Sequence, residues 1–222
     1  MGYHWDFAIV FRFAPALLHG TVLTLELTAI TIVFGTLLGA LVEVLRRVPS
    51  RLASFVVALY IEVFRALPLL VLLVWLYYLL PLAWGIRISS FLTAAIAMTV
   101  NLSAFAAVTI RSGLEAVPRG QNEAALALGM NPSQVLFRIV LPQTARVLLP
   151  NLLGLYITML KLSSLASVIA VYELLHSANT VISQVYRPLE IYTVIALIYL
   201  ILVLPMSYLS KRLESRVQPR PA

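Results

Sequence analysis

Five long apolar segments constrain the fold of this chain more than any other feature. They cover residues 17–45, 53–80, 91–110, 147–171 and 191–209. An α-helix needs about 20 apolar residues to cross the hydrocarbon core of a bilayer. Because that core offers no water to the backbone, a single spanning segment has to be a helix. The sequence therefore predicts an all-α, polytopic membrane protein with about five transmembrane helices.

The composition supports a membrane protein and excludes several other classes. Of the 222 residues, 61% are hydrophobic and only 11% are charged, whereas about a quarter are charged in a soluble domain. The net charge of +7 does not indicate nucleic-acid binding, because the basic residues cluster at the ends of apolar segments. The absence of cysteine excludes disulfides and thiolate sites. His4, His19 and His176 lack the spacing of metal ligands, so we expect no metal site.

Basic residues are distributed unequally between the two sides of the predicted bundle. One side holds Arg46, Arg47, Arg51, Arg111, Arg119, Arg138, Arg146, Lys211, Arg212, Arg216 and Arg220, and the other holds Arg12, Arg87 and Arg187. Cytoplasmic loops carry the excess of Lys and Arg. We therefore expect the N-terminus outside and the C-terminus in the cytoplasm.

These observations predict three regions. Residues 1–16 mix aromatic and charged side chains, which suits an interfacial segment outside the cytoplasm. Residues 17–212 are expected to form the transmembrane domain, and residues 213–222 a cytoplasmic tail.

In the first span, Gly35 and Gly39 form a small-xxx-small pattern that allows close helix contact, although glycine is frequent in membrane helices in any case. The segment 172–188 is interpreted as a loop.

A polar stretch before the fourth span predicts two short helices joined by a bend. Residues 123–128 are good helix formers, and Gly129 suits a left-handed residue that ends a helix. Asn131 is a suitable cap and Pro132 a suitable first residue for the next helix. Pro142 is expected to break that second helix. On the cytoplasmic side, such a helical hairpin would present a rigid surface to a partner.

The same stretch closely resembles the EAA loop of ATP-binding-cassette (ABC) importer permeases. The family pattern is E-A-A, three residues, G, nine residues, then I-x-L-P. The matching residues are Glu123, Ala124, Ala125, Gly129, Ile139, Leu141 and Pro142. Gly120, Gln121 and Gln143 beside them resemble the polar amino-acid uptake branch. The alternative for this stretch is an amphipathic interfacial helix without a partner.

The resemblance extends over nearly the whole chain. The further matching residues are Gly20, Thr21 and Thr24; Tyr60, Ile61, Glu62, Arg65, Pro68, Leu69 and Leu70; Ser103, Ala104, Phe105, Arg111 and Gly113; and Lys161, Ser163, Ser164 and Leu165. The resemblance implies a type I ABC importer permease fold in the bacterial cytoplasmic (inner) membrane, with the loop 119–142 as a cytoplasmic coupling helix.

Such permeases work in pairs, as homodimers or heterodimers. Each subunit docks one ATPase, and an extracytoplasmic binding protein delivers the solute. The residues implied in ATPase coupling are Glu123, Ala124, Ala125, Gly129, Arg138 and Pro142. The chain has neither a phosphate-binding glycine-rich loop nor a catalytic set. We therefore expect a transport subunit that is not an enzyme and has no cofactor, with ATP and Mg²⁺ bound by the partner ATPase.

Six polar residues and one aromatic residue inside the apolar segments are candidates for the solute path. They are Arg65, Asn101, Ser103, Phe105, Lys161, Ser163 and Ser164. A charge in a membrane span is costly unless it faces a cavity or a partner. For Arg65 the favoured alternative is an ion pair with Glu62, three residues earlier. Asn101, Ser103 and Ser164 are equally able to bond neighbouring helices.

Two departures from the family pattern bear on the solute. Val108 and Leu162 stand where relatives commonly have Glu and Asp. Because a buried cation needs a counter-charge, we expect a zwitterionic or acidic solute.

A channel or secondary carrier is the second functional hypothesis, although no inverted repeat is obvious. A membrane enzyme is the third, and the missing catalytic set disfavours it.

Overall fold

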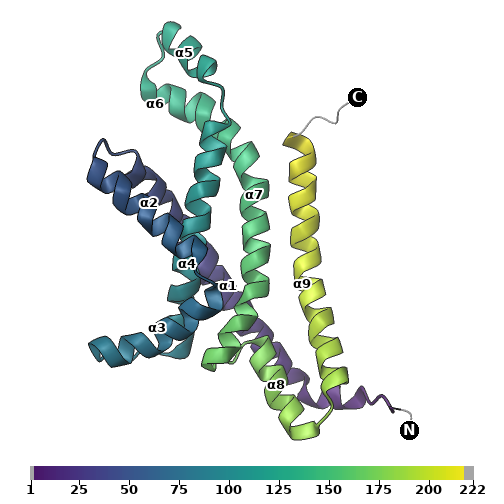
Figure 1. Ribbon diagram of the computed structural model, residues 1–222. Coiled ribbons are helices and arrows are strands. Elements are labelled where there is room, and N and C mark those ends of the chain that lie inside the picture. The colour runs from purple at the N-terminus through teal and green to yellow at the C-terminus, as the bar shows by residue number, and fades with distance from the viewer. Residues whose placement is uncertain (1–2, 218–222) are drawn as a thin grey trace.

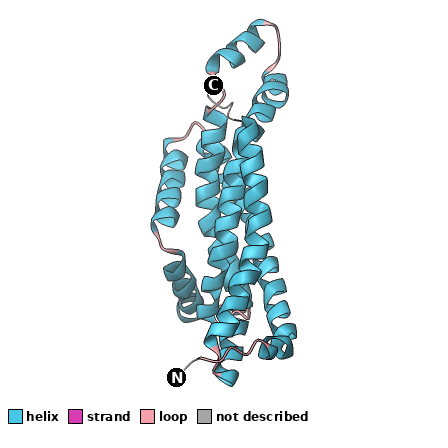
Figure 2. Cartoon of the chain, turned by 90° about the vertical axis from the view of Figure 1, so that its right-hand side faces the viewer, coloured by secondary structure: helices cyan, strands magenta, loops and turns pink. Residues whose placement is uncertain are grey.

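The computed structural model describes residues 3–217 of the chain, which form helices and connecting loops without a strand in that range (Figure 1, Figure 2). The elements are α1 (Ala8–Arg46), α2 (Arg51–Ala66), α3 (Leu69–Trp84), α4 (Ser90–Glu115), α5 (Arg119–Ala127), α6 (Pro132–Val135), the π-helix η1 (Leu136–Val140), α7 (Leu141–Leu162), the 3₁₀-helix η2 (Ser163–Ile169), α8 (Leu174–Val185) and α9 (Pro188–Val217). The all-α prediction is therefore confirmed.

Four continuous segments of the described chain are long and apolar enough to cross a membrane. They are α1, α4, the segment Pro132–Ile169 and the Pro188–Ser215 part of α9. The second predicted span, residues 53–80, is wrong as a single helix. It is instead the pair α2 and α3, bent by 106° at a short break. The predicted number of five spans holds if this bent pair counts as one.

Pro68 explains why the second span breaks. Proline has no backbone N–H to continue the helical hydrogen bonds, and it drives the preceding residue out of the α region. Accordingly Leu67 has an extended backbone with ψ of 126°, and Pro68 has ψ of 133°. Helix α3 starts directly afterwards, at Leu69.

Helices α1 and α4 pack against each other at the centre of the molecule. Their contact uses the two glycines of the predicted small-xxx-small pattern. A Cβ atom on Gly35 would lie 2.8 Å from the Leu102 side chain, and one on Gly39 would lie 2.8 Å from the Ser103 carbonyl oxygen. These distances are too short for any larger residue, so the predicted close helix contact is confirmed.

The segment 172–188, for which the sequence predicts a loop, contains α8. Glu173 caps this helix: its carboxylate oxygens accept hydrogen bonds from the N–H of Leu175 at 2.9 Å and of His176 at 2.8 Å. Leu174, together with other residues on one face of α8, is buried against α1 and α9. The apolar residues at helical spacing were the sequence signal for this helix, whereas Glu is not among the residues usually preferred at an N-cap.

The start of α1 and the end of α9 lie at opposite ends of the molecule, and the α5–α6 hairpin projects beyond the end where α9 finishes (Figure 1). At the other end, the residues before α1 are attached to α9. The N–H of Asp6 donates to Glu190 Oε1 at 3.1 Å, and the Tyr3 hydroxyl donates to the same carboxylate. Helix α1 itself begins at Ala8, within the segment 1–16 that we expect to be interfacial.

Candidate functional site

The first helix of the α5–α6 hairpin, for which the sequence predicts a coupling role, ends as expected. Gly129 has a left-handed backbone with φ of +81°. Its N–H donates to the carbonyl of Leu126 at 3.0 Å, and the N–H of Met130 donates to that of Ala125 at 3.2 Å. This pair of bonds is the Schellman arrangement, which satisfies the last carbonyls of a helix. The bend of the hairpin is therefore set by local hydrogen bonds.

The second helix of the hairpin begins with a complete capping box. The Asn131 side chain accepts a hydrogen bond from the N–H of Gln134 at 2.9 Å, and the Gln134 side chain accepts one from the N–H of Asn131 at 3.1 Å. Pro132 occupies the first turn, where a missing N–H costs nothing. The predicted restart at Asn131 and Pro132 is confirmed.

The predicted break at Pro142 is wrong. The chain runs as one helical segment from Pro132 to Ile169, and Pro142 lies in the first turn of α7. The π-helix η1 directly precedes it, with the N–H of Leu141 donating to the carbonyl of Leu136, five residues back. A proline ring clashes with the carbonyl four residues earlier in a regular helix. The wider π-turn accommodates the proline ring, so the second helix of the hairpin continues into α7 as one helical segment.

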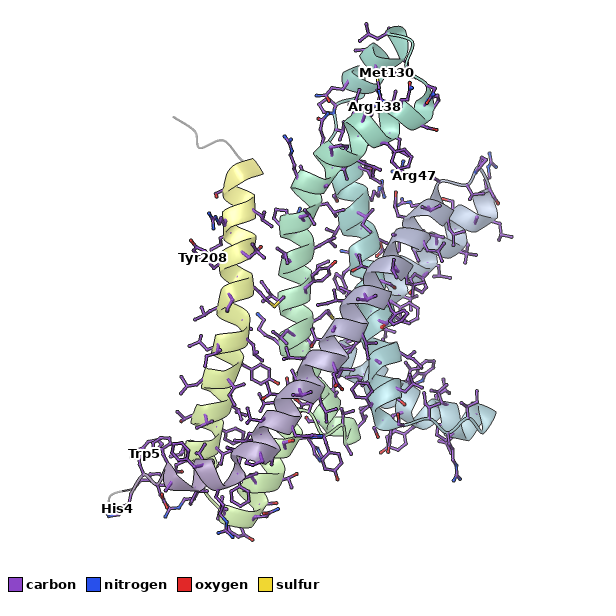
Figure 3. All side chains as sticks on the ribbon, turned by 180° about the vertical axis from the view of Figure 1, so that it is seen from behind. His4, Trp5, Arg47, Met130, Arg138 and Tyr208 are labelled. Atoms are coloured by element: carbon purple, nitrogen blue, oxygen red, sulfur yellow. The ribbon has the colours of Figure 1, made fainter. Side chains whose placement is uncertain are left out.

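The hairpin exposes apolar side chains as well as charged ones. Leu128 is 84% exposed and Phe137 is 67% exposed. Of the predicted coupling residues, Glu123, Ala124 and Arg138 are also exposed, whereas Ala125 is buried. Met130 and Arg138 lie on the projecting hairpin, with Arg47 below it at the end of α1 (Figure 3). An exposed apolar surface of this kind on a rigid support is typical of a protein-binding site.

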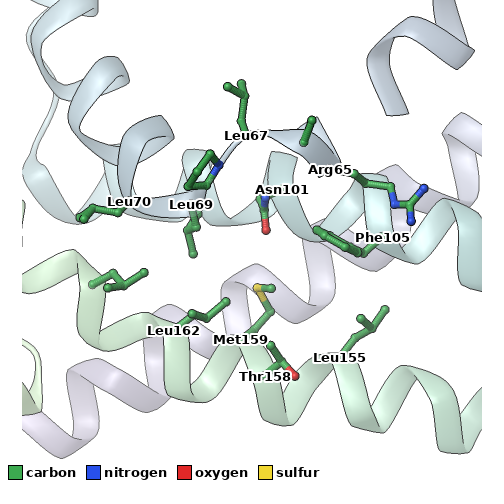
Figure 4. Close-up of a pocket in the computed structure, with 13 residues that line it drawn as sticks. Arg65, Leu67, Leu69, Leu70, Asn101, Phe105, Leu155, Thr158, Met159 and Leu162 are labelled. Carbon is green, nitrogen blue, oxygen red and sulfur yellow. The ribbon is translucent and has the colours of Figure 1, made fainter. Parts of the chain in front are cut away.

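A cavity of about 450 Å³ opens at the break between α2 and α3, facing α4 and α7 (Figure 4). Its lining residues are Arg65, Ala66, Leu67, Pro68, Leu69, Leu70, Asn101, Phe105, Leu155, Thr158, Met159, Leu162 and Leu165. The lining is largely apolar, as in most small-molecule sites. Within this set from the described residues, Arg65 is the one charged side chain.

Arg65 lies over an aromatic ring at the edge of this cavity. Its Cζ is 5.6 Å from the centroid of the Phe105 ring, within the range of a cation–π contact. Its Nη1 is 4.0 Å from Glu62 Oε1, but the Glu62 side chain is 76% exposed. Exposed ion pairs contribute only about 0–1 kcal/mol. The predicted ion pair is therefore present, at a long distance and with an exposed partner.

Asn101 connects α4 to the helix break. This residue is only 4% exposed, and its Nδ2 donates a hydrogen bond to the carbonyl of Phe64 at 3.0 Å. Of the two uses expected for Asn101, a bond between helices is therefore the one that the structure contains. Its side chain also lines the cavity (Figure 4).

The remaining predicted path residues lie outside the cavity lining of the described chain. Ser103 is fully buried and its Oγ is 2.6 Å from the Tyr60 hydroxyl, which joins α4 to α2. Ser163 and Ser164 donate hydrogen bonds to carbonyls of their own helical turns, at 2.7 and 2.8 Å. Lys161 is exposed on α7. The cavity thus unites three of the seven candidates, Arg65, Asn101 and Phe105.

The sequence interpretation missed the wall that α7 contributes. Leu155, Thr158, Met159 and Leu162 line the cavity from this helix. Their spacing of three and four residues places them on one face of a helix, and this periodicity was a signal in the sequence. The signal is weak, because apolar residues also occupy other faces of this helix.

Comparison with known proteins identifies the family of the chain. Residues 14–219 match the family model of the binding-protein-dependent transport system inner membrane component. The glutamine transport system permease protein GlnP of Escherichia coli (strain K12) is 31% identical over 215 residues, which cover 96% of this chain and 98% of that relative. The L-cystine transport system permease protein TcyB of Bacillus subtilis (strain 168) is 35% identical, with 96% of this chain and 91% of that relative covered.

The fold also matches a solved structure of an amino acid ABC transporter with histidines. The TM-score is 0.89 at 35% sequence identity, and the match covers 96% of this chain and 100% of the chain in that structure. Fold and site therefore define an ABC importer permease of type I. The chain belongs to the family of binding-protein-dependent transport system inner membrane components.

Proposed function

We propose that this chain forms the translocation path for a polar amino acid or a similar small zwitterion. The cavity at the break between α2 and α3 carries the proposal, because it joins Arg65, Asn101 and Phe105 at the predicted path. The relatives GlnP and TcyB are named for the transport of glutamine and of L-cystine. Both of these solutes are amino acids with a carboxylate and an ammonium group.

The charges around the cavity favour a solute that carries a carboxylate. Arg65 offers a guanidinium group, which matches the geometry of a carboxylate. Leu162, where the family commonly has Asp, is itself a lining residue. An added cationic side chain on the solute would meet no counter-charge from the lining residues that the structure describes, and an unpaired charge is costly in such surroundings. We therefore favour a zwitterionic or acidic solute over arginine or lysine.

The proposed partners follow from the two ends of the molecule. The α5–α6 hairpin with Glu123, Gly129 and Arg138 would dock an ATPase subunit, which binds ATP and Mg²⁺. The end that carries the start of α1 would face the extracytoplasmic binding protein, with the N-terminus outside and the C-terminus in the cytoplasm. A second permease subunit would complete the path, because about five helices are too few to enclose a solute and also face lipid.

The proposal is tested by purifying the chain with its associated subunits and measuring uptake into proteoliposomes. Labelled glutamine, glutamate, arginine and an ectoine-like zwitterion are compared with and without ATP. We expect ATP-dependent uptake of a neutral or acidic solute, in a complex with two permease subunits and two ATPase subunits. Preferred uptake of arginine would contradict the solute class. Uptake without any ATPase would instead support the alternative of a channel or secondary carrier.

A further inference from the structure

Pro68 leaves one carbonyl group of α2 without its helical partner. In a continuous helix the N–H of residue 68 would donate to the carbonyl of Phe64, four residues earlier. Proline has no N–H to donate. The preceding bond is intact, since the N–H of Leu67 donates to the carbonyl of Val63 at 3.1 Å. Helix α2 therefore ends with a Phe64 carbonyl that lacks its backbone donor, at a residue that is itself half-buried.

Asn101 supplies the missing donor from another helix. Its Nδ2 lies 3.0 Å from the Phe64 carbonyl oxygen, and the residue is only 4% exposed. The bond lies in a partly buried position, and a carbonyl that loses water without gaining a partner is costly. The carboxamide of Asn101 thus takes the place of the N–H that Pro68 lacks.

The position of Asn101 along α4 is also the point where two packing clusters meet. On one side, Val57 and Ile61 of α2 pack with Ala107 of α4. On the other side, Leu72 of α3 packs with Met98 of α4. Asn101 lies between Met98 and Ala107 in sequence. Helix α4 therefore packs against α2 on one side of the bend and against α3 on the other, and Asn101 bonds the backbone at the bend itself.

A proline alone does not produce such a break in this chain. Pro15, Pro81, Pro150 and Pro205 all lie inside helices that continue past them. Pro68 differs in that the carbonyl it leaves unpaired is bonded by the side chain of a neighbouring helix. The break at Pro68 is therefore distinguished from the four continuous helices by the hydrogen bond from Asn101 to the Phe64 carbonyl, which accompanies the proline.

We propose that Asn101 is a positioning residue for transport, whose bond to the Phe64 carbonyl fixes the bend between α2 and α3. Arg65 lies in the last turn of α2, directly before the bend, and lines the cavity. A loosened bend would let the Arg65 guanidinium move relative to Phe105 and to the α7 wall. Only the uptake part of the test below rests on the proposed function.

The hydrogen bond is tested by thermal unfolding of the detergent-solubilised complex. Asn101→Leu is expected to lower the melting temperature by several degrees. The control is Asn151→Leu, because Asn151 is exposed and bonds only a carbonyl of its own helix, that of Val147 at 3.2 Å. The rescue is Pro68→Ala in the Asn101→Leu background, since the substitution restores a backbone N–H that is able to donate to the Phe64 carbonyl. The proposal is overturned if Asn101→Leu behaves like the control, or if the second substitution restores no stability.

The bend is tested separately with spin labels. The chain has no cysteine, so Leu59→Cys on α2 and Tyr78→Cys on α3, both at exposed positions of 54% and 59%, give a unique label pair. Asn101→Leu is expected to broaden the distance distribution, whereas Asn151→Leu leaves it narrow. In uptake assays Asn101→Leu should raise KM several-fold more than it lowers the maximal rate. An unchanged distance distribution would refute the positioning role, whatever solute is carried.

Discussion

A Cβ atom on Gly39 would stand 2.8 Å from the carbonyl oxygen of Ser103, so the backbones of α1 and α4 touch at this point. Real Cβ atoms do not approach a backbone oxygen so closely, and a backbone is unable to swing aside as a flexible side chain does. The neighbouring Ser103 hydroxyl in turn lies 2.6 Å from the Tyr60 hydroxyl of α2. The contact at Gly39 therefore sets the distance between α1 and α4, the helix that carries the cavity residues Asn101 and Phe105.

Replacing Gly39 with Ala is expected to destabilise the protein by about 1–3 kcal/mol, the usual cost of overpacking. The matched control is Gly154→Ala, because a Cβ atom at Gly154 meets nothing within 4 Å. That control is expected to be neutral, or more stable by about 0.5–1 kcal/mol from its helix propensity. Thermal unfolding in detergent micelles measures both. Equal melting temperatures for the two variants would contradict the close contact.

Replacing Gly129 with Val is expected to impair coupling without affecting membrane insertion. Gly129 has φ of +81° and nothing within 4 Å of its Cβ position, so the cost is local backbone strain of about 1–2 kcal/mol. Solute-stimulated ATPase activity and uptake should both fall. Gly85→Val is the control, because Gly85 has φ of +66° in equally open space but ends α3, far from the hairpin. A Gly129 variant with normal stimulation would argue against the hairpin as the ATPase contact.

Replacing Arg65 with Gln is expected to raise the KM for solute several-fold, since Gln removes the guanidinium charge from the cavity. Glu62→Gln should have little effect, because the Glu62 side chain is 76% exposed and its Oε1 lies as far as 4.0 Å from Arg65 Nη1. Uptake into proteoliposomes at varied solute concentration separates the two. If both variants had the same KM as the unmodified protein, Arg65 would have no part in solute binding.

Replacing Glu173 with Ala is expected to destabilise α8 and its packing by about 0.5–2 kcal/mol, the usual cost of losing an N-cap, because two N–H groups in the first turn lose their acceptor. Those groups belong to Leu175 and His176, at 2.9 and 2.8 Å. Tyr199→Phe removes only the longer hydroxyl contact at 3.3 Å and should cost less. Melting temperatures compare the two variants. A larger effect for Tyr199→Phe would mean that the cap is not the main role of Glu173.

Local sequence signals were sufficient to predict four of the five spans as single helices, and the bend of the α5–α6 hairpin. Gly129, Asn131 and Pro132 act through hydrogen bonds and backbone angles within a few residues of themselves. Their effect is therefore independent of the rest of the chain. The apolar length of each segment likewise determines that it enters the bilayer.

Tertiary structure decided how the segments bend and which polar residues meet. Pro68 breaks its span while Pro150 leaves α7 continuous, and the difference involves Asn101, a residue far along the chain that bonds the Phe64 carbonyl. Packing likewise turns Thr158 toward the cavity and leaves Lys161 exposed. In a membrane helix nearly every face is apolar, so hydropathy alone does not reveal which face looks inward. Only contacts between residues distant in sequence determine that rotation.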